Sequence, residues 1–67
     1  MNGIDGAARL PELERWVGMS RSSIYRLEAA GEFPRRVRLG GRAVGWLRAD
    51  VRAWLESRPT ARADQAA

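Results

Sequence analysis

Apolar residues near the start of the chain follow a helical spacing. Leu13, Trp16 and Val17 lie at positions i, i+3 and i+4, which predicts a helix with a narrow apolar face. Pro11 falls in the first turn, where its missing N–H group costs nothing. Gly18 suits the left-handed residue that ends a helix. The first predicted element is therefore a short helix that stops at Gly18.

A second helix is predicted over residues 20–30, directly after a tight turn. Ser20 is a suitable N-cap, because its hydroxyl group accepts a hydrogen bond from a free N–H group of the next turn. Ile24 and Leu27 are spaced to face a core, and Gly31 is a stop signal. Two helices joined in this way predict a helix-turn-helix.

A β-hairpin is predicted after the second helix. Phe33 precedes Pro34 and is pushed toward an extended conformation, so the helix does not continue. Large apolar residues then alternate with basic ones over residues 36–39 and with small ones over residues 43–46, on either side of Gly40 and Gly41. A two-residue Gly-Gly loop between alternating segments is typical of a hairpin.

The register of this hairpin is predicted by pairing residues outward from a Gly40-Gly41 loop. Leu39 then lies opposite Arg42, and Arg35 lies opposite Trp46. Alternation of side chains along a strand places the apolar residues on one face: Val37, Leu39, Val44 and Trp46. The opposite face carries basic residues beside small ones: Arg36, Arg38, Ala43 and Gly45.

A third helix is predicted from near Ala49 to Arg58, where Val51, Trp54 and Leu55 repeat the helical spacing. Residues 1–8 are expected to form a flexible arm, residues 9–58 one folded domain, and residues 59–67 a disordered tail. The predicted fold is a small α+β winged helix-turn-helix, in the order helix, helix, β-hairpin wing, helix.

Composition limits the possible functions. A chain of 67 residues has room for one modest core. It contains neither Cys nor His, which excludes disulfides, imidazole catalysis and the common zinc motifs, so no metal or cofactor is expected. The eight acidic residues form no paired catalytic site, so we do not expect an enzyme. The absence of a long apolar run or a signal-peptide core predicts a cytoplasmic protein without a membrane partner.

The positive charge is unevenly distributed. All twelve basic residues are arginine, and the net charge is +4. A GC-rich genome would explain arginine in place of lysine, but it would not explain the location of the charge. Five arginines and no acidic residue lie between Phe33 and Ala49. A polyanion, in particular double-stranded DNA, is the expected partner.

The second helix carries most of the candidate base-reading residues. The first turn of a recognition helix normally faces base edges, although polar residues at a helix start are also commonly just solvated. Two roles are open for Tyr25: it contacts a phosphate or a thymine methyl group of the DNA, or it belongs to the core. For Arg26 the alternatives are binding to guanine, binding to a phosphate, or an ion pair with an acidic residue. The candidates on this helix are Ser20, Arg21, Ser22, Ser23, Tyr25 and Arg26.

The predicted wing supplies the remaining candidates. Arg42 either enters a minor groove, where negative potential is concentrated, or is an exposed charge that blocks edge aggregation. Arg35, Arg36 and Arg38 either contact phosphates or form a solvated cationic face. The three tryptophans lie on apolar faces, which favours core positions over stacking on single-stranded bases: Trp16, Trp46 and Trp54.

Several short motifs together resemble the AlpA family of prophage transcriptional regulators, within the excisionase-like, MerR-type winged helix-turn-helix proteins. They are R-L-P-E-L at residues 9–13, G-M-S-R-S-S-I-Y-R-L at 18–27, G-E-F-P-R at 31–35, V-R-L-G-G-R-A-V-G-W at 37–46 and D-V-R-A-W-L at 50–55. One departure is the sequence Leu47-Arg48-Ala49, where relatives often carry a capping residue before the third helix.

The resemblance implies a sequence-specific DNA-binding regulator of prophage or integrative-element genes. Residues 20–30 would enter the major groove, and the Gly40-Gly41 wing would contact the backbone or minor groove. The further partners expected are integrase or the transcription machinery, together with weak self-association or cooperative multimers on DNA. The protein is expected to be associated with the nucleoid. Two alternatives stay open: an excisionase-type recombination directionality factor that bends attachment-site DNA, and an anti-repressor-like module that binds protein.

Overall fold

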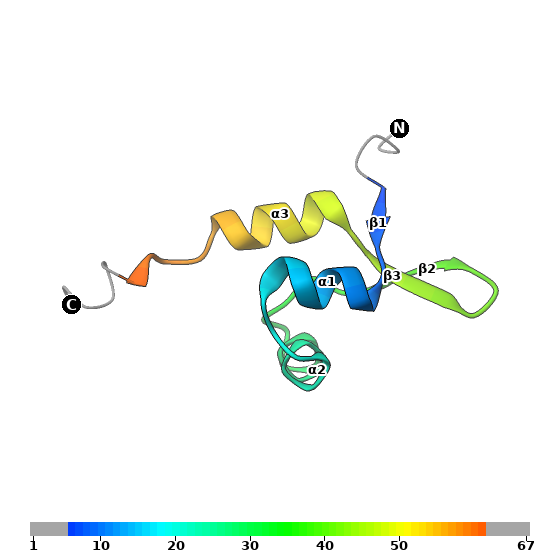
Figure 1. Cartoon of the computed structure of the whole chain (residues 1–67), viewed down its shortest axis with the longest axis horizontal. Helices are drawn as coiled ribbons and strands as arrows, with labels where there is room; N and C mark the ends of the chain where they lie inside the picture. Colours follow the sequence, from blue (N-terminus) through cyan, green and yellow to red (C-terminus); the bar gives the residue numbers. More distant parts are fainter. Residues whose placement is uncertain (1–5, 62–67) are drawn as a thin grey trace.

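The computed structural model describes residues 6–61, which contain three helices and three short strands (Figure 1). Helix α1 crosses the view of Figure 1 while α2 is seen nearly end-on, so the two helices cross steeply. The hairpin and α3 project away from them on opposite sides. This is the predicted winged helix-turn-helix. Its elements are β1 (Ala7–Ala8), α1 (Leu10–Val17), α2 (Arg21–Ala29), β2 (Val37–Gly40), β3 (Ala43–Leu47) and α3 (Arg48–Glu56).

The turn between α1 and α2 has the structure that the sequence predicts. Gly18 adopts a left-handed conformation, with φ of 72°, and its N–H group donates to the carbonyl oxygen of Glu14 at 2.9 Å. Ser20 is the N-cap of α2, and its Oγ accepts from the backbone N–H of Ser23 at 3.3 Å. Residues within a few positions of each other thus determine how α2 leaves α1.

One core joins the helices to the sheet. Its fully or almost fully buried side chains come from α1, α2, the loop before β2, β3 and α3: Leu13, Ile24, Phe33, Trp46 and Val51. The other two tryptophans, Trp16 and Trp54, are partly buried against this core, so all three pack as apolar side chains. The indole N–H of Trp54 also donates to the carbonyl oxygen of Glu32 at 2.8 Å.

The sheet has a third strand that the sequence analysis does not predict. The strand order is β1-β3-β2, and β1 pairs antiparallel with β3 through Ala7 with Leu47 and Ala8 with Trp46. The flexible arm expected over residues 1–8 is therefore wrong for Ala7 and Ala8, and residues 1–5 lie outside the described part. Ala8 is completely buried. Two alanines show neither alternation nor β-propensity, so the strand depends on the surface that β3 offers.

Strand β1 also explains how α3 starts without a capping side chain. Leu47 is the N-cap residue of α3 and makes no side-chain cap hydrogen bond. The backbone N–H of Arg48 instead donates to the carbonyl oxygen of Gly6 at 3.0 Å. The first free N–H of the helix thus finds its partner in the N-terminal segment, and α3 begins one residue before the predicted Ala49. Of the tail expected over residues 59–67, residues 62–67 lie outside the described part.

The predicted hairpin register is wrong. Val37 pairs with Gly45, Arg38 with Val44 and Gly40 with Ala43, with a bulge between Arg38 and Gly40. Residues 41 and 42, instead of 40 and 41, form the loop, and Gly41 has the positive φ of 51° that a tight hairpin loop favours at its first position.

This register exchanges the expected faces of β2. Val37 lies on the face of Gly45, while Arg38 lies on the face of Val44 and Trp46. Leu39 remains 44% exposed and lies over Gly45, with its Cδ1 only 2.9 Å from the point where a Cβ atom on Gly45 would stand. Because Gly45 has no side chain, Leu39 can occupy the space above it. A register predicted only from the position of the loop does not reveal this fit.

We expect Gly45→Ala to destabilise the fold. An added Cβ would lie 2.9 Å from the backbone oxygen of Ala8 as well as from the Leu39 side chain. Leu39 can rotate, but the Ala8 carbonyl belongs to the β1–β3 pair, so we expect a loss of about 1–3 kcal/mol. Thermal unfolding followed by circular dichroism measures this loss, with Leu39→Ala as a milder control. A melting temperature equal to that of the wild type would show that β1 shifts without cost.

An ion pair connects α1 to the start of α3. The Nη2 atom of Arg48 lies 2.6 Å from Oε1 of Glu12, and its Nε donates to Oε2 at 3.1 Å. This hydrogen bond and charge lower the pKa of the Glu12 carboxyl below its ordinary value of 4.5, against a smaller opposing effect of burial. Arg48 is therefore bound to a structural partner within the fold.

The Glu12 pKa shift predicts a specific loss of stability in acid. Because the folded state lowers this pKa, the stabilisation is complete above the unfolded value of 4.5 and disappears as the pH falls through the lower folded value. Glu12→Gln should remove this component and flatten the pH dependence of the melting temperature as the pH falls below 4.5. Equal pH dependence in the variant and the wild type would contradict the assignment.

Candidate nucleic-acid interface

Helix α2 has one buried and one exposed face. Ile24 and Glu28 are buried, and Leu27 packs partly against the core. The opposite face exposes the candidates Arg21, Ser22 and Arg26, together with part of Tyr25. The predicted reading helix therefore presents polar and basic side chains to a possible ligand.

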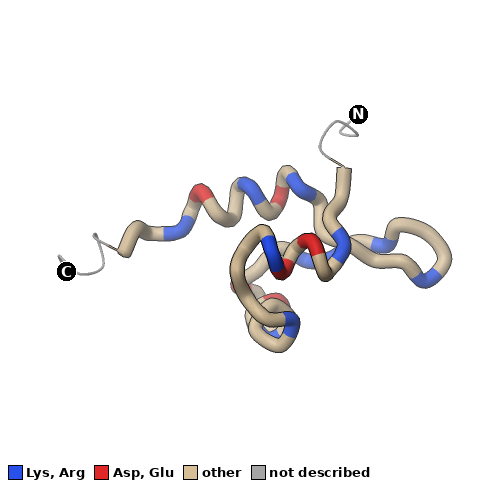
Figure 2. Tube along the Cα trace, in the orientation of Figure 1, with Lys and Arg blue, Asp and Glu red and all other residues tan. Residues whose placement is uncertain are grey.

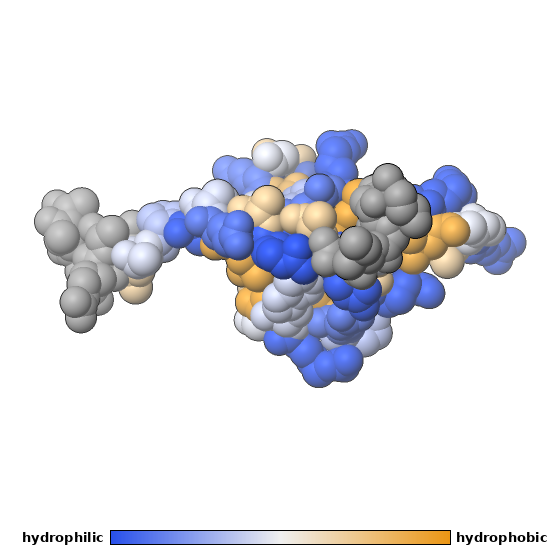
Figure 3. Space-filling view, turned by 90° about the horizontal axis from the view of Figure 1, so that it is seen from above, coloured by the Kyte–Doolittle hydropathy of each residue, from blue (hydrophilic) through white to orange (hydrophobic). Residues whose placement is uncertain are grey.

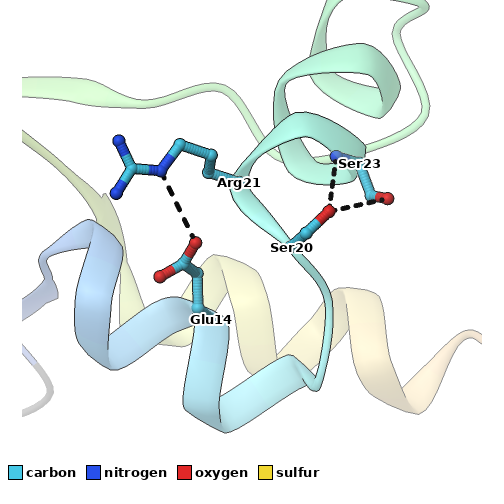
Figure 4. A network of polar contacts seen from close by, with 4 residues as sticks. All are labelled: Glu14, Ser20, Arg21 and Ser23. Carbon is cyan, nitrogen blue, oxygen red and sulfur yellow. Dashed lines mark hydrogen bonds and ion pairs between the residues drawn. The ribbon is translucent and has the colours of Figure 1, made fainter.

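The start of α2 is held by contacts across the turn (Figure 4). Ser20 donates its hydroxyl hydrogen to Oγ of Ser23 at 3.2 Å while accepting from the Ser23 backbone. Arg21 reaches back toward α1, where its Nε lies 3.8 Å from Oε2 of Glu14. The Arg21 side chain is 68% exposed, so this long ion pair orients it only weakly. Ser20 and Ser23 thus have a structural role in the turn.

Tyr25 connects the core to the surface. Its side of α2 faces the sheet, where the Tyr25 and Trp46 ring centroids are 6.4 Å apart. The guanidinium carbon of Arg36 lies 5.0 Å from the centroid of the same tyrosine ring. Since 38% of Tyr25 is exposed, the ring is part of both the packing and the surface. It brings α2 and the segment that leads into β2 together.

Glu28 is a residue that the sequence analysis misses. It is only 8% exposed, and its Oε2 accepts from the backbone N–H of Arg36 at 2.8 Å. Its Oε1 lies 3.6 Å from Nε of Arg36. A signal was available, because Glu28 lies at the i+4 position of the apolar face that contains Ile24 and Leu27. A carboxylate at such a position needs a partner.

The wing carries basic residues and no acidic ones (Figure 2). Arg38 donates from Nη1 to the carbonyl oxygen of Gly41 at 3.0 Å and so stabilises the loop from within. Arg42 lies in the exposed loop, and Arg35 is exposed ahead of β2. Figure 3 also shows an apolar area on the hairpin beside hydrophilic residues at its end, in agreement with the exposure of Leu39.

The arginines between Phe33 and Ala49 differ in how the fold holds them. Arg48 is paired with Glu12, and Arg36 with Glu28. Among the described residues, the side chains of Arg26, Arg35 and Arg42 make no hydrogen bond or ion pair. The candidates thus divide into arginines fixed by the fold and arginines exposed at its edge.

Within residues 6–61 there is no group of three acidic side chains that could hold a metal ion. No helix in the same part of the chain is long and apolar enough to cross a bilayer.

The residue pattern of a known family matches this chain from residue 6 to residue 59. The family is described as "Prophage CP4-57 regulatory protein (AlpA)". The chain belongs to the AlpA family. The match begins at Gly6, the residue whose carbonyl group caps α3, so the family pattern includes strand β1. It also includes every helix and strand of the described part.

Two relatives show how far this similarity extends. An uncharacterized protein, ORF88, of Enterobacteria phage P4 is 50% identical over 50 residues, which cover 75% of this chain and 57% of that protein. The DNA-binding transcriptional activator AlpA of Escherichia coli (strain K12) is 36% identical over 58 residues, covering 75% of this chain and 80% of that protein. The chain therefore spans little more than half the length of the phage relative.

Ser20→Ala should destabilise the protein, whereas Ser22→Ala should not. Ser20 caps α2 and bonds to Ser23, while Ser22 is exposed two residues further along the same turn. Loss of an N-cap costs about 0.5–2 kcal/mol, which thermal unfolding of both variants would detect. If the two variants unfold alike, the turn does not depend on the Ser20 hydroxyl group.

Proposed function

We propose that this AlpA-family protein is a sequence-specific DNA-binding transcriptional regulator of prophage or integrative-element genes. Helix α2 enters a major groove, and the wing contacts the backbone or the minor groove next to it. Membership of a family of prophage regulators supports this role, as does the relative whose name describes a DNA-binding transcriptional activator.

The observation that carries the proposal is the contact between Tyr25 and Arg36. It joins α2 to the segment that leads into β2, which supports a DNA-binding surface formed by the helix together with the wing. A helix-turn-helix inserts the start of its second helix into the major groove, while basic side chains nearby bind phosphates. The exposed Arg21 and Arg26 then contact bases, and Arg35, Arg36, Arg38 and Arg42 contact the backbone or minor groove.

A single module of this size binds weakly by itself. Such modules bury only about 600–1,000 Å² of protein surface on DNA. We therefore propose that several copies bind adjacent sites cooperatively, with integrase or the transcription machinery as neighbours.

Substitutions on the helix and on the wing should have different effects. Arg21→Ala or Arg26→Ala should cost about 1–3 kcal/mol on the preferred site and relax its specificity. Arg36→Ala or Arg38→Ala should weaken binding to all sequences nearly equally and reduce the salt slope by about one. Fluorescence anisotropy against specific and scrambled duplexes, at several salt concentrations, separates the two classes. If all four variants behave alike, α2 is not the reading helix.

The wild-type protein should be tested on DNA from upstream of its own gene, on the neighbouring attachment site and on a scrambled duplex. Specific regulation predicts a preference of at least about tenfold for one natural fragment, with a steep salt dependence. No binding even at low salt would reject the proposal and favour the protein-binding, anti-repressor-like alternative.

The exposure of Leu39 favours a second candidate function, that of a recombination directionality factor. Proteins that bind the minor groove often insert an apolar side chain between base steps and bend the duplex. Leu39 is 44% exposed on the hairpin, close to the loop that carries Arg42. Fluorescence energy transfer across a labelled attachment site would report such bending, which a plain activator does not require.

A further inference from the structure

We propose that Glu28 is a positioning residue that holds the Arg36 guanidinium ready for one phosphate of the DNA backbone. This inference rests on the proposed DNA binding and goes beyond it, since it assigns a separate role to a buried acidic residue. The three residues concerned are Glu28 and Tyr25 on α2 and Arg36 ahead of β2.

The contacts restrict the Arg36 side chain at several points. The Arg36 backbone N–H donates to Glu28 Oε2 at 2.8 Å, which fixes the position of its Cα atom relative to α2. The Nε edge faces Glu28 Oε1 at 3.6 Å, and the guanidinium carbon lies 5.0 Å from the Tyr25 ring centroid. The Arg36 side chain is nevertheless 46% exposed.

These contacts leave the terminal nitrogens of Arg36 available. An arginine has five N–H donors, and only Nε faces Glu28. Among the described residues neither Nη atom has a hydrogen-bond partner. Two parallel N–H groups on a planar guanidinium fit two oxygens of one phosphate. The structure therefore presents a prealigned phosphate donor at the junction of α2 and the wing.

A purely structural role explains the burial of Glu28 less completely. A buried carboxylate is costly unless it is paired and hydrogen-bonded, and a neutral glutamine could equally accept from the Arg36 backbone. Compared with a glutamine, the negative charge of Glu28 additionally attracts the Nε edge of the Arg36 guanidinium. Prealignment matters because immobilising a long side chain on binding costs affinity, and a side chain already held avoids that loss.

Arg35 is a natural control for this inference. It carries the same charge one position earlier and is exposed, but within the described residues no ion pair, hydrogen bond or aromatic ring holds it. If only their positive charge mattered, Arg35 and Arg36 would contribute equally to DNA binding. Positioning makes Arg36 the more important of the two.

Positioning and net charge predict opposite effects on DNA binding when the charge of Glu28 is removed. Removing a negative charge from a DNA-binding protein should strengthen binding if only net charge matters. If Glu28 positions Arg36, Glu28→Gln should instead weaken binding, because the guanidinium loses its orientation while the backbone hydrogen bond to Arg36 remains possible.

The experiment is a double-mutant cycle with fluorescence anisotropy on the preferred duplex. We expect E28Q to weaken binding about two- to tenfold in the wild-type background and to have no weakening effect in an R36A background. R36A should weaken binding more than R35A does. Circular dichroism melts identify variants that are less folded at the assay temperature.

The possible outcomes separate the two proposals. Tighter binding by E28Q, or equal losses for R35A and R36A, would overturn the positioning role while leaving DNA binding intact. If E28Q does not fold, the comparison of R35A with R36A still tests the proposal, because equal losses would overturn it. Absence of wild-type binding to any duplex would overturn the proposed function itself, and the positioning role with it.

Discussion

The complete burial of the Trp46 side chain is the constraint on which the rest of the structure depends. Trp46 lies on the central strand β3, with β1 paired on one side, β2 on the other and α3 following directly. Its ring contacts Tyr25 of α2, and it shares one core with Leu13 of α1 and Val51 of α3. The indole N–H is buried without a partner among the described residues, a cost of about 1–3 kcal/mol that burial of the large ring must offset.

Local signals predicted the helices well, because they act over a few residues. Gly18 ends α1 and Ser20 begins α2 through contacts no more than four residues apart. Strand β1 and the register of the hairpin depend on contacts between distant segments. The decisive feature is Gly45, which lies under Leu39 and next to the Ala8 backbone. A hydrophobic pattern along one strand does not contain that information.

For the candidate site, the sequence predicted the exposed residues of α2 but not the ion pairs of the arginines. The exposed face of α2 follows from the amphipathic spacing, so Arg21, Ser22 and Arg26 lie on the surface as expected. Counting charges along the chain could not show which arginines the fold pairs with acidic side chains. Glu12 pairs with Arg48 across 36 residues, and Glu28 pairs with Arg36 across eight. The electrostatic surface is a property of the folded chain. Fewer of its arginines are without an acidic partner than the sequence alone indicates.

Strand β1 also covers one edge of β3. Without Ala7 and Ala8, one side of β3 would expose unpaired backbone N–H and carbonyl groups, and such an edge readily pairs with a strand of another chain. The carbonyl group of Gly6 would be lost to α3 at the same time. A version of the protein shortened to begin at Leu10 would therefore retain the sequence of all three helices but would expose an unpaired edge of β3. The short N-terminal strand thus closes one edge of the sheet and also supplies a hydrogen-bond acceptor to the start of α3.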